Sequence, residues 1–450
     1  MSFFFSLAEL STILRIKPVG STLNNLNINV FSVTTDSRTL QPQSIFIALV
    51  GENFNGHDFA RQAEEQGAIA LIVDHQLNSI NIPQFIVQDT LEAYQQIARW
   101  WRDRFEIPVI GITGSVGKTS TKELIAAVLG TQGKVLKTEA NFNNEIGVPK
   151  TLLQITPEHK YAVIEMAMRA PGEIALLTEI ARPTIGVITN VGTAHIGRLG
   201  SREAIAQAKC ELLAKMPPSS TAILNYDNSL LIDTAAQVWS GKTITYGLSG
   251  GDIQGEIHGE QISTLGRNLP LPLSGKHNAS NYLAAIAVAQ SLNLDLTPLV
   301  AGLQVQLPQG RARRHDLPGD MVLLDETYNA GLESMLAALE MLKATPGKRH
   351  IAVLGTMKEL GDHSAPLHYQ VGTKAQELNL DLLLILAEDT ATEEIAKGAP
   401  DVTCECFRDC GTLTKRLLEL LAPGDRILCK ASNSVGLSRV VAEVVQQLAP

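Results

Sequence analysis

Cysteine, basic residues and long apolar segments are all scarce in this sequence, and each scarcity excludes a class of protein. There are 5 cysteines in 450 residues, an odd number that gives no disulfide framework and fits a reducing compartment. Cys404, Cys406 and Cys410 cluster without an obvious fourth ligand, so we expect no metal site there. Lys and Arg number 37 against 46 Asp and Glu, and the net charge of −9 argues against binding nucleic acid or an anionic membrane through bulk charge.

The N-terminus and the hydropathy pattern give no sign of export or of membrane insertion. The opening MSFFFSLAELSTIL has no basic leader, and Glu9 interrupts its apolar residues, which predicts an amphipathic first helix and not a signal peptide. No uninterrupted apolar run reaches the roughly 18 residues that a membrane-spanning helix needs. We therefore expect a cytoplasmic protein without membrane insertion and without a nucleic-acid partner, and a monomer is the expected assembly.

The rest of the composition is that of a large folded protein. Hydrophobic residues make up 45% of the chain and charged residues 18%, which provides an ample core. A length of 450 residues predicts about two to four domains, with three as the central value. Because the protein as a whole is acidic, any phosphate on a ligand must be met by local positive sites.

The segment VIGITGSVGKTSTK, residues 109–122, is the strongest functional signal in the chain. It predicts a buried parallel strand over Val109–Thr113, a glycine turn, and a helix from Lys118 to Gly130. Such a turn aims backbone amides and a helix N-terminus at an anion. The strict P-loop pattern is not met, because Ile112 stands where its first glycine belongs, and the alternative is a turn that only closes a βα unit. The predicted ATP-binding residues here are Thr113, Gly114, Ser115, Val116, Gly117, Lys118, Thr119 and Ser120.

Residues 1–105 alternate predicted strands and helices and form a first α/β domain. Strands are expected over Ile28–Val33, Ser44–Leu49 and Ile69–Val73, with a helix over Asp58–Gln66. A polar loop follows the first strand and offers an acceptor, a hydroxyl and a guanidinium that suit a sugar or a phosphate, unless it is only a solvated loop. The candidate residues of this loop are Thr35, Asp36, Ser37 and Arg38.

Residues 106–314 form a predicted central domain with polar side chains at its strand ends. Asn143 and Asn144 lie in a loop that can surround a phosphate or a carboxylate, or that only makes a turn. The strand 161–164 ends at Glu165, and an ionised Glu at the end of a buried strand needs a partner or a metal, so Mg²⁺ is expected. His195 lies just beyond the strand 184–190, where a satisfied loop histidine is the more common outcome.

Two predicted helices of the central domain carry further candidates. The helix 201–215 has Ser201 as its N-cap, and Lys209 lies next to its apolar face, where it either snorkels to solvent or changes its chemistry. In the Ala-rich helix 274–292, Asn278 and Asn281 are spaced i, i+3 and share one face. Two amides on one face hydrogen-bond an adenine or merely cap the helix, and the spacing does not choose between them.

The stretch PQGRARRHD, residues 308–316, reads as a linker, and we place a domain boundary near 314. Beyond it, strands are expected over Met321–Leu324, His350–Leu354, Leu382–Leu386 and Asp425–Lys430, separated by helices. Residues 315–450 are therefore predicted to form a second, smaller Rossmann-like α/β domain. No GxGxxG fingerprint is present, so a dinucleotide site is not expected.

Taken together, the ordered motifs resemble those of the Mur ligases, the ATP-dependent amide-forming enzymes of peptidoglycan synthesis. The resemblance rests on TTDSR, TGSVGKTSTKE, NFNNEIGVPKTLL, EMAMRAPGEI, NVGTAH, SGKHNASNYLAA, QGRARR, LDETYNAGLESM and GTMKELG. It implies a three-domain α/β fold with a UDP-substrate domain, a central ATPase domain and a C-terminal domain that binds the incoming dipeptide. Within the family, the chain looks closest to the member that adds D-alanyl-D-alanine to UDP-N-acetylmuramoyl-tripeptide.

The resemblance also implies roles for individual residues. Lys118 would hold the β- and γ-phosphates of ATP, Thr119 and Glu165 would ligate one Mg²⁺, and His195 would help to bind a second. Lys209 falls where the family carries a carbamylated lysine, which acts as a carboxylate-like metal ligand. The residues expected to contact the nucleotide are Asn278, Asn281, Arg311, Asp325, Tyr328 and Asn329, and those expected to contact the UDP-muropeptide are Thr35, Asp36, Ser37, Arg38, Asn143 and Asn144.

The implied reaction is ATP-dependent amide ligation through an acyl phosphate, which yields a UDP-linked pentapeptide. The near alternatives are another Mur-type amino-acid ligase and a ligase related to the folate-polyglutamylating enzymes. A less favoured alternative is a P-loop switch or scaffold that binds nucleotide to control a partner and needs no small-molecule substrate.

Overall fold

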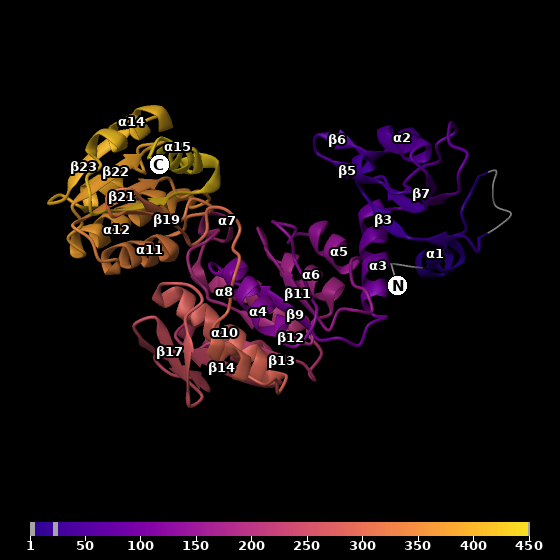
Figure 1. Cartoon of the computed structure of the whole chain (residues 1–450). Coiled ribbons are helices and arrows are strands. Elements are labelled where there is room, and N and C mark those ends of the chain that lie inside the picture. Colours follow the sequence, from indigo (N-terminus) through magenta and orange to yellow (C-terminus); the bar gives the residue numbers. More distant parts are fainter. Residues whose placement is uncertain (1–4, 21–25, 449–450) are drawn as a thin grey trace.

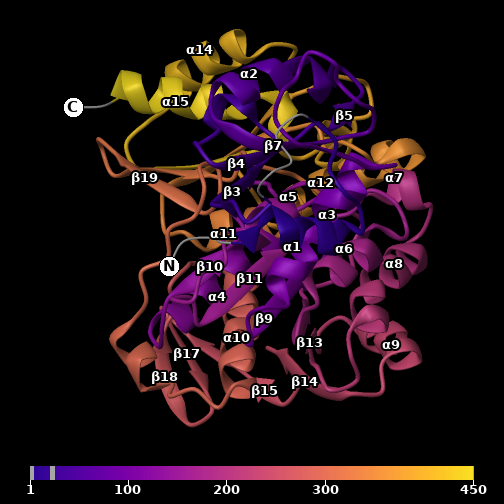
Figure 2. The same ribbon diagram turned by 90° about the vertical axis from the view of Figure 1, so that its right-hand side faces the viewer.

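The computed structural model describes residues 5–20 and 26–448, and these residues form three α/β domains, as predicted (Figure 1). The N-terminal domain lies at one end and the C-terminal domain at the other, with the central domain between them (Figure 1). In Figure 1 the central domain also lies below the other two domains, and it does so in the view turned by 90° as well (Figure 2). Within the described residues, no helix has both the length and the apolar character needed to cross a membrane.

The N-terminal domain is built on a parallel sheet in the order β3–β4–β7–β8. The predicted amphipathic first helix is confirmed as α1, whose start is fixed because Glu9 N donates to Ser6 Oγ at 3.1 Å and Ser6 N donates to Glu9 Oε2 at 2.8 Å. The predicted strand 28–33 is wrong in one respect, because it divides into β2 and β3, which lie in different sheets. The elements are β1 Phe5–Ser6, α1 Leu7–Leu14, β2 Asn29–Val30, β3 Ser32–Thr34, η1 Ser37–Thr39, β4 Ser44–Ile47, β5 Val50–Gly51, β6 Phe54–Asn55, η2 Gly56–Phe59, α2 Ala60–Glu65, β7 Ala68–Val73, β8 Gln84–Ile86 and α3 Thr90–Arg102.

Helix α3 connects the N-terminal domain to the central one. It packs against α1 on one side and against α5 and α6 of the central domain on the other. Trp101 Nε1 donates to the Ile155 carbonyl at 3.0 Å, and Arg102 Nε donates to the Ala181 carbonyl at 3.0 Å, with both side chains buried. Because these bonds satisfy polar groups that burial has removed from water, they fix the angle at which the first domain meets the second.

The main sheet of the central domain is parallel, in the order β10–β11–β9–β12–β13–β14–β15, with two strands on one side of β9 and four on the other. A separate antiparallel sheet is formed by β16, β17 and β18. Its predicted main strands and helices are confirmed, and α4 begins and ends at the predicted residues. In the register, Glu165 pairs with Ile112 and Ile188 pairs with Thr113, so the ends of β11, β9 and β12 lie together. The elements are β9 Val109–Thr113, α4 Lys118–Gly130, β10 Val135–Lys137, α5 Gly147–Leu152, β11 Tyr161–Glu165, α6 Glu173–Ala181, β12 Ile185–Ile188, α7 Ile196–Leu199, α8 Arg202–Lys215, β13 Thr221–Asn225, α9 Ser229–Val238, β14 Lys242–Gly247, β15 Ile253–Gln254, β16 Glu256–His258, β17 Gln261–Thr264, β18 Arg267–Pro270, α10 Lys276–Ser291 and η3 Thr297–Ala301.

Apolar side chains cover both faces of the central sheet. Helices α4 and α10 pack together on one face through residues such as Leu124, Leu129 and Ile286, while α5, α6 and α8 share a core on the other. A sheet buried on both faces needs strands that are apolar throughout, which β9 and β12 satisfy. The polar side chains are therefore confined to the strand ends, where open α/β sheets bind ligands.

The C-terminal domain has a sheet in the order β19–β20–β24–β21–β22–β23, with only β19 antiparallel among its described strands. The four predicted strands are confirmed, but the second half of the predicted linker is β19. It pairs with β20 along its length, so it is ordered by the sheet despite its charged sequence. The elements are β19 Arg313–Leu317, β20 Met321–Asp325, α11 Leu332–Ala344, β21 Arg349–Gly355, η4 Gly361–His363, α12 Ser364–Glu377, β22 Leu382–Leu386, α13 Glu394–Gly398, β23 Thr403–Phe407, α14 Cys410–Leu420, β24 Asp425–Lys430, η5 Asn433–Val435 and α15 Leu437–Leu448.

Candidate functional site

A cavity of about 370 Å³ lies between the central and C-terminal domains, at the strand ends of both. Its lining joins loops from the two domains, so it is complete only when they lie together. The predicted site residues among its walls are Ser115, Val116, Gly117, Lys118, Thr119, Ser120, Asn143, Glu165, His195, Asn278, Asn281, Arg311, Tyr328 and Asn329. His277, Glu326 and Lys430 line it as well and were not predicted.

The glycine turn after β9 has the tight geometry that the sequence predicts. Gly114 has φ 150°, and a Cβ there would lie 1.9 Å from Thr189 Oγ1. Gly117 has φ 82°, and a Cβ there would lie 2.8 Å from Asn281 Oδ1. Both positions therefore require glycine, one for the loop packed against it and one for the approach of α10.

Asn190, which was not among the predicted site residues, holds the turn in place. Ser115 N donates to the Asn190 carbonyl at 3.0 Å, and Val116 N donates to Asn190 Oδ1 at 3.0 Å. These two turn amides are thus paired within the protein, contrary to the expectation that they point at a ligand. The first bond of α4 runs from Thr121 N to the Gly117 carbonyl at 2.8 Å, so the amides before Thr121 at the helix start are the ones available to an anion.

Lys118 lies over the turn, where its ammonium is held by the main chain. Its Nζ donates to the Gly114 carbonyl at 2.7 Å and to the Ser115 carbonyl at 3.3 Å. Burial lowers the pKa of Lys118, Glu165 opposes that shift and Arg311 adds to it. A cation at this point faces the space beside the helix N-terminus, which suits a phosphate chain.

Glu165 is paired at the end of β11, as its burial requires. Thr119 Oγ1 lies 3.2 and 3.0 Å from the two carboxylate oxygens, and Asn143 Nδ2 donates to Oε1 at 2.9 Å. Lys122, which was not a predicted site residue, lies 3.8 Å from Glu165 Oε2 and donates to the Thr138 carbonyl at 2.7 Å. The hydroxyl and carboxylate oxygens that Mg²⁺ prefers therefore meet on the wall of the cavity.

His195 and Lys209 lie near Lys118, and its positive charge affects the pKa of both side chains. Burial lowers the pKa of His195, Lys118 adds to the shift, and Glu359 opposes it. Burial also lowers the pKa of Lys209 well below its usual value, and Lys118 again adds to the shift. Lys209 is 1% exposed, so the snorkelling alternative is wrong, and no carboxylate within the described residues pairs with it. Burial of this kind favours the neutral amine over the ammonium.

The far wall of the cavity carries a stacked guanidinium and aromatic ring and two side-chain amides, which are groups that suit a nucleotide base. Arg311 stacks over the Tyr328 ring at 4.0 Å, and its Nε is buried with no hydrogen-bond partner among the described residues. Asn278 Nδ2 donates to the Ser274 carbonyl at 2.8 Å, and Asn281 Nδ2 lies 3.4 Å from Asn278 Oδ1. Asn278 thus anchors the helix start, while Asn281 lies against the turn at Gly117.

Lys430 closes the same wall from the C-terminal domain. It is 3% exposed, and its Nζ donates to the Asn329 carbonyl at 2.9 Å and lies 3.9 Å from Glu326 Oε2. Lys430 ends β24 as Glu165 ends β11, and a buried charge at the end of an apolar strand is the signal that would have identified it.

Several predicted residues lie outside this cavity. Thr113 is buried at the end of β9. Asn144 Oδ1 accepts a hydrogen bond from Gly147 N at 2.9 Å, near the start of α5. Asp325 accepts a hydrogen bond from Thr327 and lines an adjacent cavity of about 650 Å³. The residues Thr35, Asp36, Ser37 and Arg38 belong to the N-terminal domain (Figure 1). That loop is nevertheless organised, because Arg38 donates to both oxygens of Asp36 at 2.8 and 2.7 Å and holds the pKa of that carboxyl at about 2.

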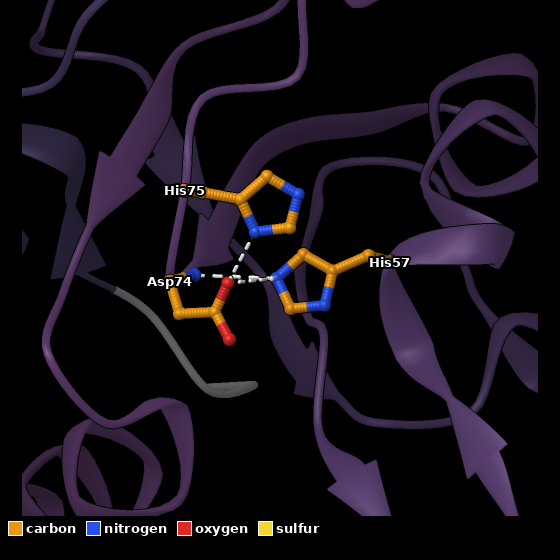
Figure 3. A group of neighbouring side chains, drawn as sticks. All are labelled: His57, Asp74 and His75. Atoms are coloured by element: carbon orange, nitrogen blue, oxygen red, sulfur yellow. Dashed lines mark hydrogen bonds and ion pairs between the residues drawn. The ribbon is translucent and has the colours of Figure 1, made fainter.

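A second group of ionisable side chains lies in the N-terminal domain, where His57, Asp74 and His75 converge on one carboxylate oxygen (Figure 3). His57 N and Nδ1 both lie within 3.0 Å of Asn55 Oδ1, which fixes the proton on Nδ1. The Nε2 of His57 lies 3.2 Å from Asp74 N and 3.1 Å from Asp74 Oδ1. Because hydrogen bonds within the protein account for these atoms, we assign no metal to this group.

Comparison with protein families gives the same three segments as the fold. The chain matches the family description "Mur ligase family, catalytic domain" over residues 29–101 and "Mur ligase middle domain" over residues 112–289. Residues 310–433 match the description "Mur ligase, glutamate ligase domain".

Individual relatives resemble the chain over nearly its whole length. It is 57% identical, over 98% of both chains, to the UDP-N-acetylmuramoyl-tripeptide–D-alanyl-D-alanine ligase of Synechocystis sp.. Crystal structure I of MurF from Acinetobacter baumannii superimposes with a TM-score of 0.89 at 29% identity and covers 98% of this chain and 99% of its own. MurF from Thermotoga maritima in complex with ADP gives a TM-score of 0.83 at 28% identity, with 93% of this chain and 97% of its own covered.

Proposed function

The chain belongs to the Mur ligase family, and we propose that it joins D-alanyl-D-alanine to UDP-N-acetylmuramoyl-tripeptide in the cavity around Lys118. It is an ATP-dependent amide ligase, and its product is the UDP-linked pentapeptide from which peptidoglycan is made. The observation that supports this best is the 57% identity to such a ligase over 98% of the chain. The convergence of Lys118, Glu165 and His195 on one cavity supplies the matching chemistry.

The three domains divide the work of binding three substrates. We assign residues 1–105 to the UDP-muropeptide, 106–314 to ATP and 315–450 to the incoming dipeptide. The loop 35–38 of the first domain would meet the UDP end, and Asn143 and Asn144 would meet the peptide. Arg311, Tyr328, Asn278 and Asn281 would hold the nucleotide base and sugar, which fits a wall of stacking and amide groups.

Lys118 and the start of α4 would bind the phosphates of ATP. The ammonium of Lys118 lies beside the amides that precede Thr121, so positive charge and donors converge on one point. Two anions must meet for the reaction to start, because the peptide carboxylate attacks the γ-phosphate. Fixed positive groups that need no rearrangement lower the barrier to that approach.

The oxygen-rich wall fits Mg²⁺. Thr119 and Glu165 would hold one ion, and His195 with a modified Lys209 would help to hold a second. Such ions would offset the charge of the phosphates and of the attacking carboxylate. The fit rests on the side-by-side hydroxyl and carboxylate of Thr119 and Glu165, which are hard oxygen ligands of the kind that Mg²⁺ selects.

Lys209 has the environment that carbamylation requires. Its amine is buried with no carboxylate partner in the part of the chain that the structure describes, and its lowered pKa increases the share of the neutral form that can add to CO₂. The neutral amine nitrogen adds to the CO₂ carbon and loses one proton, which gives an anionic carbamate. Counted from the ammonium, the change releases two protons and replaces a cation by an anion. The modified side chain would then be paired by nearby positive charge instead of repelled by Lys118.

The reaction proceeds in two steps, phosphorylation of the peptide carboxylate and then aminolysis of the acyl phosphate. A carboxylate oxygen of the tripeptide attacks the γ-phosphorus, and the bond to the β-phosphate bridging oxygen breaks to release ADP. The amine of D-alanyl-D-alanine then attacks the acyl carbon, loses a proton, and expels inorganic phosphate. Loops of the C-terminal domain complete the cavity wall, and their closure would keep water from hydrolysing the acyl phosphate. The reaction belongs in the cytoplasm with ATP, and a monomer carries every residue that it uses.

Phosphate release across a substrate panel tests this assignment. We expect release only when ATP, UDP-N-acetylmuramoyl-tripeptide and D-alanyl-D-alanine are all present. Release with the dipeptide precursor and a free amino acid would identify another Mur-type ligase, and release with a folate and glutamate would identify a polyglutamylating one. Slow ATP hydrolysis at a rate that none of these substrates changes would favour a nucleotide switch.

Arg38→Ala is expected to raise the KM for the UDP-muropeptide about tenfold or more while kcat stays near the wild-type value. The guanidinium is 83% exposed and held by Asp36, so it is presented to solvent in a fixed orientation. Loss of one charge-assisted hydrogen bond to a phosphate weakens binding by about tenfold or more. Steady-state kinetics at varied UDP-muropeptide concentrations measure the change in KM. The control is Arg61→Ala, because Arg61 is another exposed arginine of the same domain. A fall in kcat with unchanged KM would contradict the assignment.

A further inference from the structure

Glu359 of the C-terminal domain reaches across the domain interface to His195. Its Oε2 lies 2.6 Å from His195 Nδ1, and its Oε1 accepts from Arg198 Nη2 at 3.2 Å. The side chains of His195 and Glu359 are 24% and 35% exposed, so the contact is partly shielded from water. Both oxygens of one carboxylate are therefore occupied by α7 and the residue that precedes it.

The contact determines which nitrogen of His195 carries the proton. A carboxylate only accepts hydrogen bonds, so Nδ1 must be the donor in this pair. In a neutral imidazole the other nitrogen, Nε2, then presents its lone pair. Histidines that bind metals commonly donate their second N–H to a carboxylate in this way, which fixes the ring and raises its basicity.

The backbone around Glu359 is arranged to deliver its side chain. Glu359 has φ 64° and His195 has φ 66°, and both lie in the left-handed region that side chains seldom adopt. The Glu359 carbonyl accepts from Gly197 N at 3.2 Å, and a Cβ on Gly197 would lie 2.5 Å from Gly361 N. Figures 1 and 2 both place α7 beside the C-terminal domain, at this close approach of two main chains.

The loop that carries Glu359 is anchored within its own domain. Met357 N donates to His368 Nε2 at 2.9 Å, and Lys358 N donates to Ser432 Oγ at 3.0 Å. Glu359 thus moves with the C-terminal domain, whereas His195 moves with the central one.

We propose that Glu359 is a positioning residue that sets the tautomer and orientation of His195, so that the metal site is completed only when the C-terminal domain is docked. The proposal rests on the metal-ligand role of His195 in the proposed function. It gives a physical link between dipeptide-domain closure and the ATP site: the docked domain supplies the carboxylate that prepares a ligand in the neighbouring domain. No contact between Glu359 and a substrate is needed.

Binding of Mn²⁺ in place of Mg²⁺, measured by electron paramagnetic resonance with a saturating non-hydrolysable ATP analogue, tests the proposal. We expect Glu359→Ala to weaken Mn²⁺ binding about 10- to 100-fold. Glu359→Gln keeps an oxygen acceptor for Nδ1, so we expect a smaller loss. Glu388→Ala removes a carboxylate of similar exposure, paired with Lys358, and is expected to leave Mn²⁺ binding within twofold of wild type.

A double mutant separates positioning from a general effect of charge. If Glu359 acts through His195, then His195→Ala/Glu359→Ala binds Mn²⁺ no more weakly than His195→Ala alone. A loss in His195→Ala without one in Glu359→Ala, or additive losses in the double mutant, would overturn the role of Glu359 and leave the proposed function intact. If Mn²⁺ binding is unchanged in His195→Ala, His195 is not a metal ligand, and the positioning role of Glu359 is overturned as well.

Discussion

Lys118→Ala is expected to reduce turnover on the order of 10³-fold while the protein stays folded. The ammonium is the positive group held directly over the glycine turn, and the approach of a carboxylate to a phosphate depends on such fixed charge. Its described hydrogen bonds go to the carbonyls of its own turn, so its removal opens no apolar cavity. Phosphate release under saturating substrates measures the loss, and circular dichroism with thermal unfolding checks the fold.

Lys134→Ala provides the matched control for this variant. Lys134 lies in the same domain, is 55% exposed and pairs with Glu158, and such a surface pair contributes about 0–1 kcal/mol. We expect wild-type turnover from Lys134→Ala. If Lys118→Ala keeps more than about a tenth of the wild-type rate, the phosphate-binding role of the turn is refuted.

Lys209→Met is expected to lower turnover about 10²- to 10³-fold and to leave the melting temperature of the ligand-free protein unchanged or higher. The change removes a buried amine that is repelled by Lys118, and it substitutes an apolar side chain of similar length. The activity falls because Met cannot form a carbamate. Turnover in CO₂-equilibrated buffer and differential scanning calorimetry measure the two effects.

Lys122→Met is the contrasting variant, because it applies the same substitution to another fully buried lysine. Lys122 pairs with Glu123 at 3.1 Å and lies 3.8 Å from Glu165. Its loss leaves Glu123 with Lys137 as its remaining ion-pair partner and leaves Glu165 with hydrogen bonds from neutral groups alone among the described residues. We expect its melting temperature to fall by several degrees. Equal destabilisation of both variants would contradict an unpaired Lys209, and mass spectrometry showing only the free amine in active, CO₂-equilibrated enzyme would contradict carbamylation.

The parts of the site that follow one strand could be predicted from the sequence. The strand 109–113, the glycine turn and the helix 118–130 depend on local periodicity and on glycine, and all three are confirmed at their predicted bounds. Glu165 was predicted to need a partner because a buried charge at a strand end is costly, and its bonds to Thr119 and Asn143 bear this out.

The parts that depend on distant pairing could not be predicted. Asn190 is separated by more than 70 residues from the turn amides that it holds, and Glu359 by 164 residues from His195. No local pattern marks such partners. The charged stretch 313–317 likewise becomes strand β19 only because β20 offers it an edge, and tertiary pairing overrides its low strand propensity.

A crystal structure of the protein with a non-hydrolysable ATP analogue and UDP-N-acetylmuramoyl-tripeptide tests the central claim most directly. We predict the γ-phosphate beside Lys118 Nζ and the first amides of α4, with the tripeptide carboxylate facing it and metal density next to Thr119, Glu165 and His195. Nucleotide bound elsewhere, or a γ-phosphate turned away from Glu165 and His195, would contradict it.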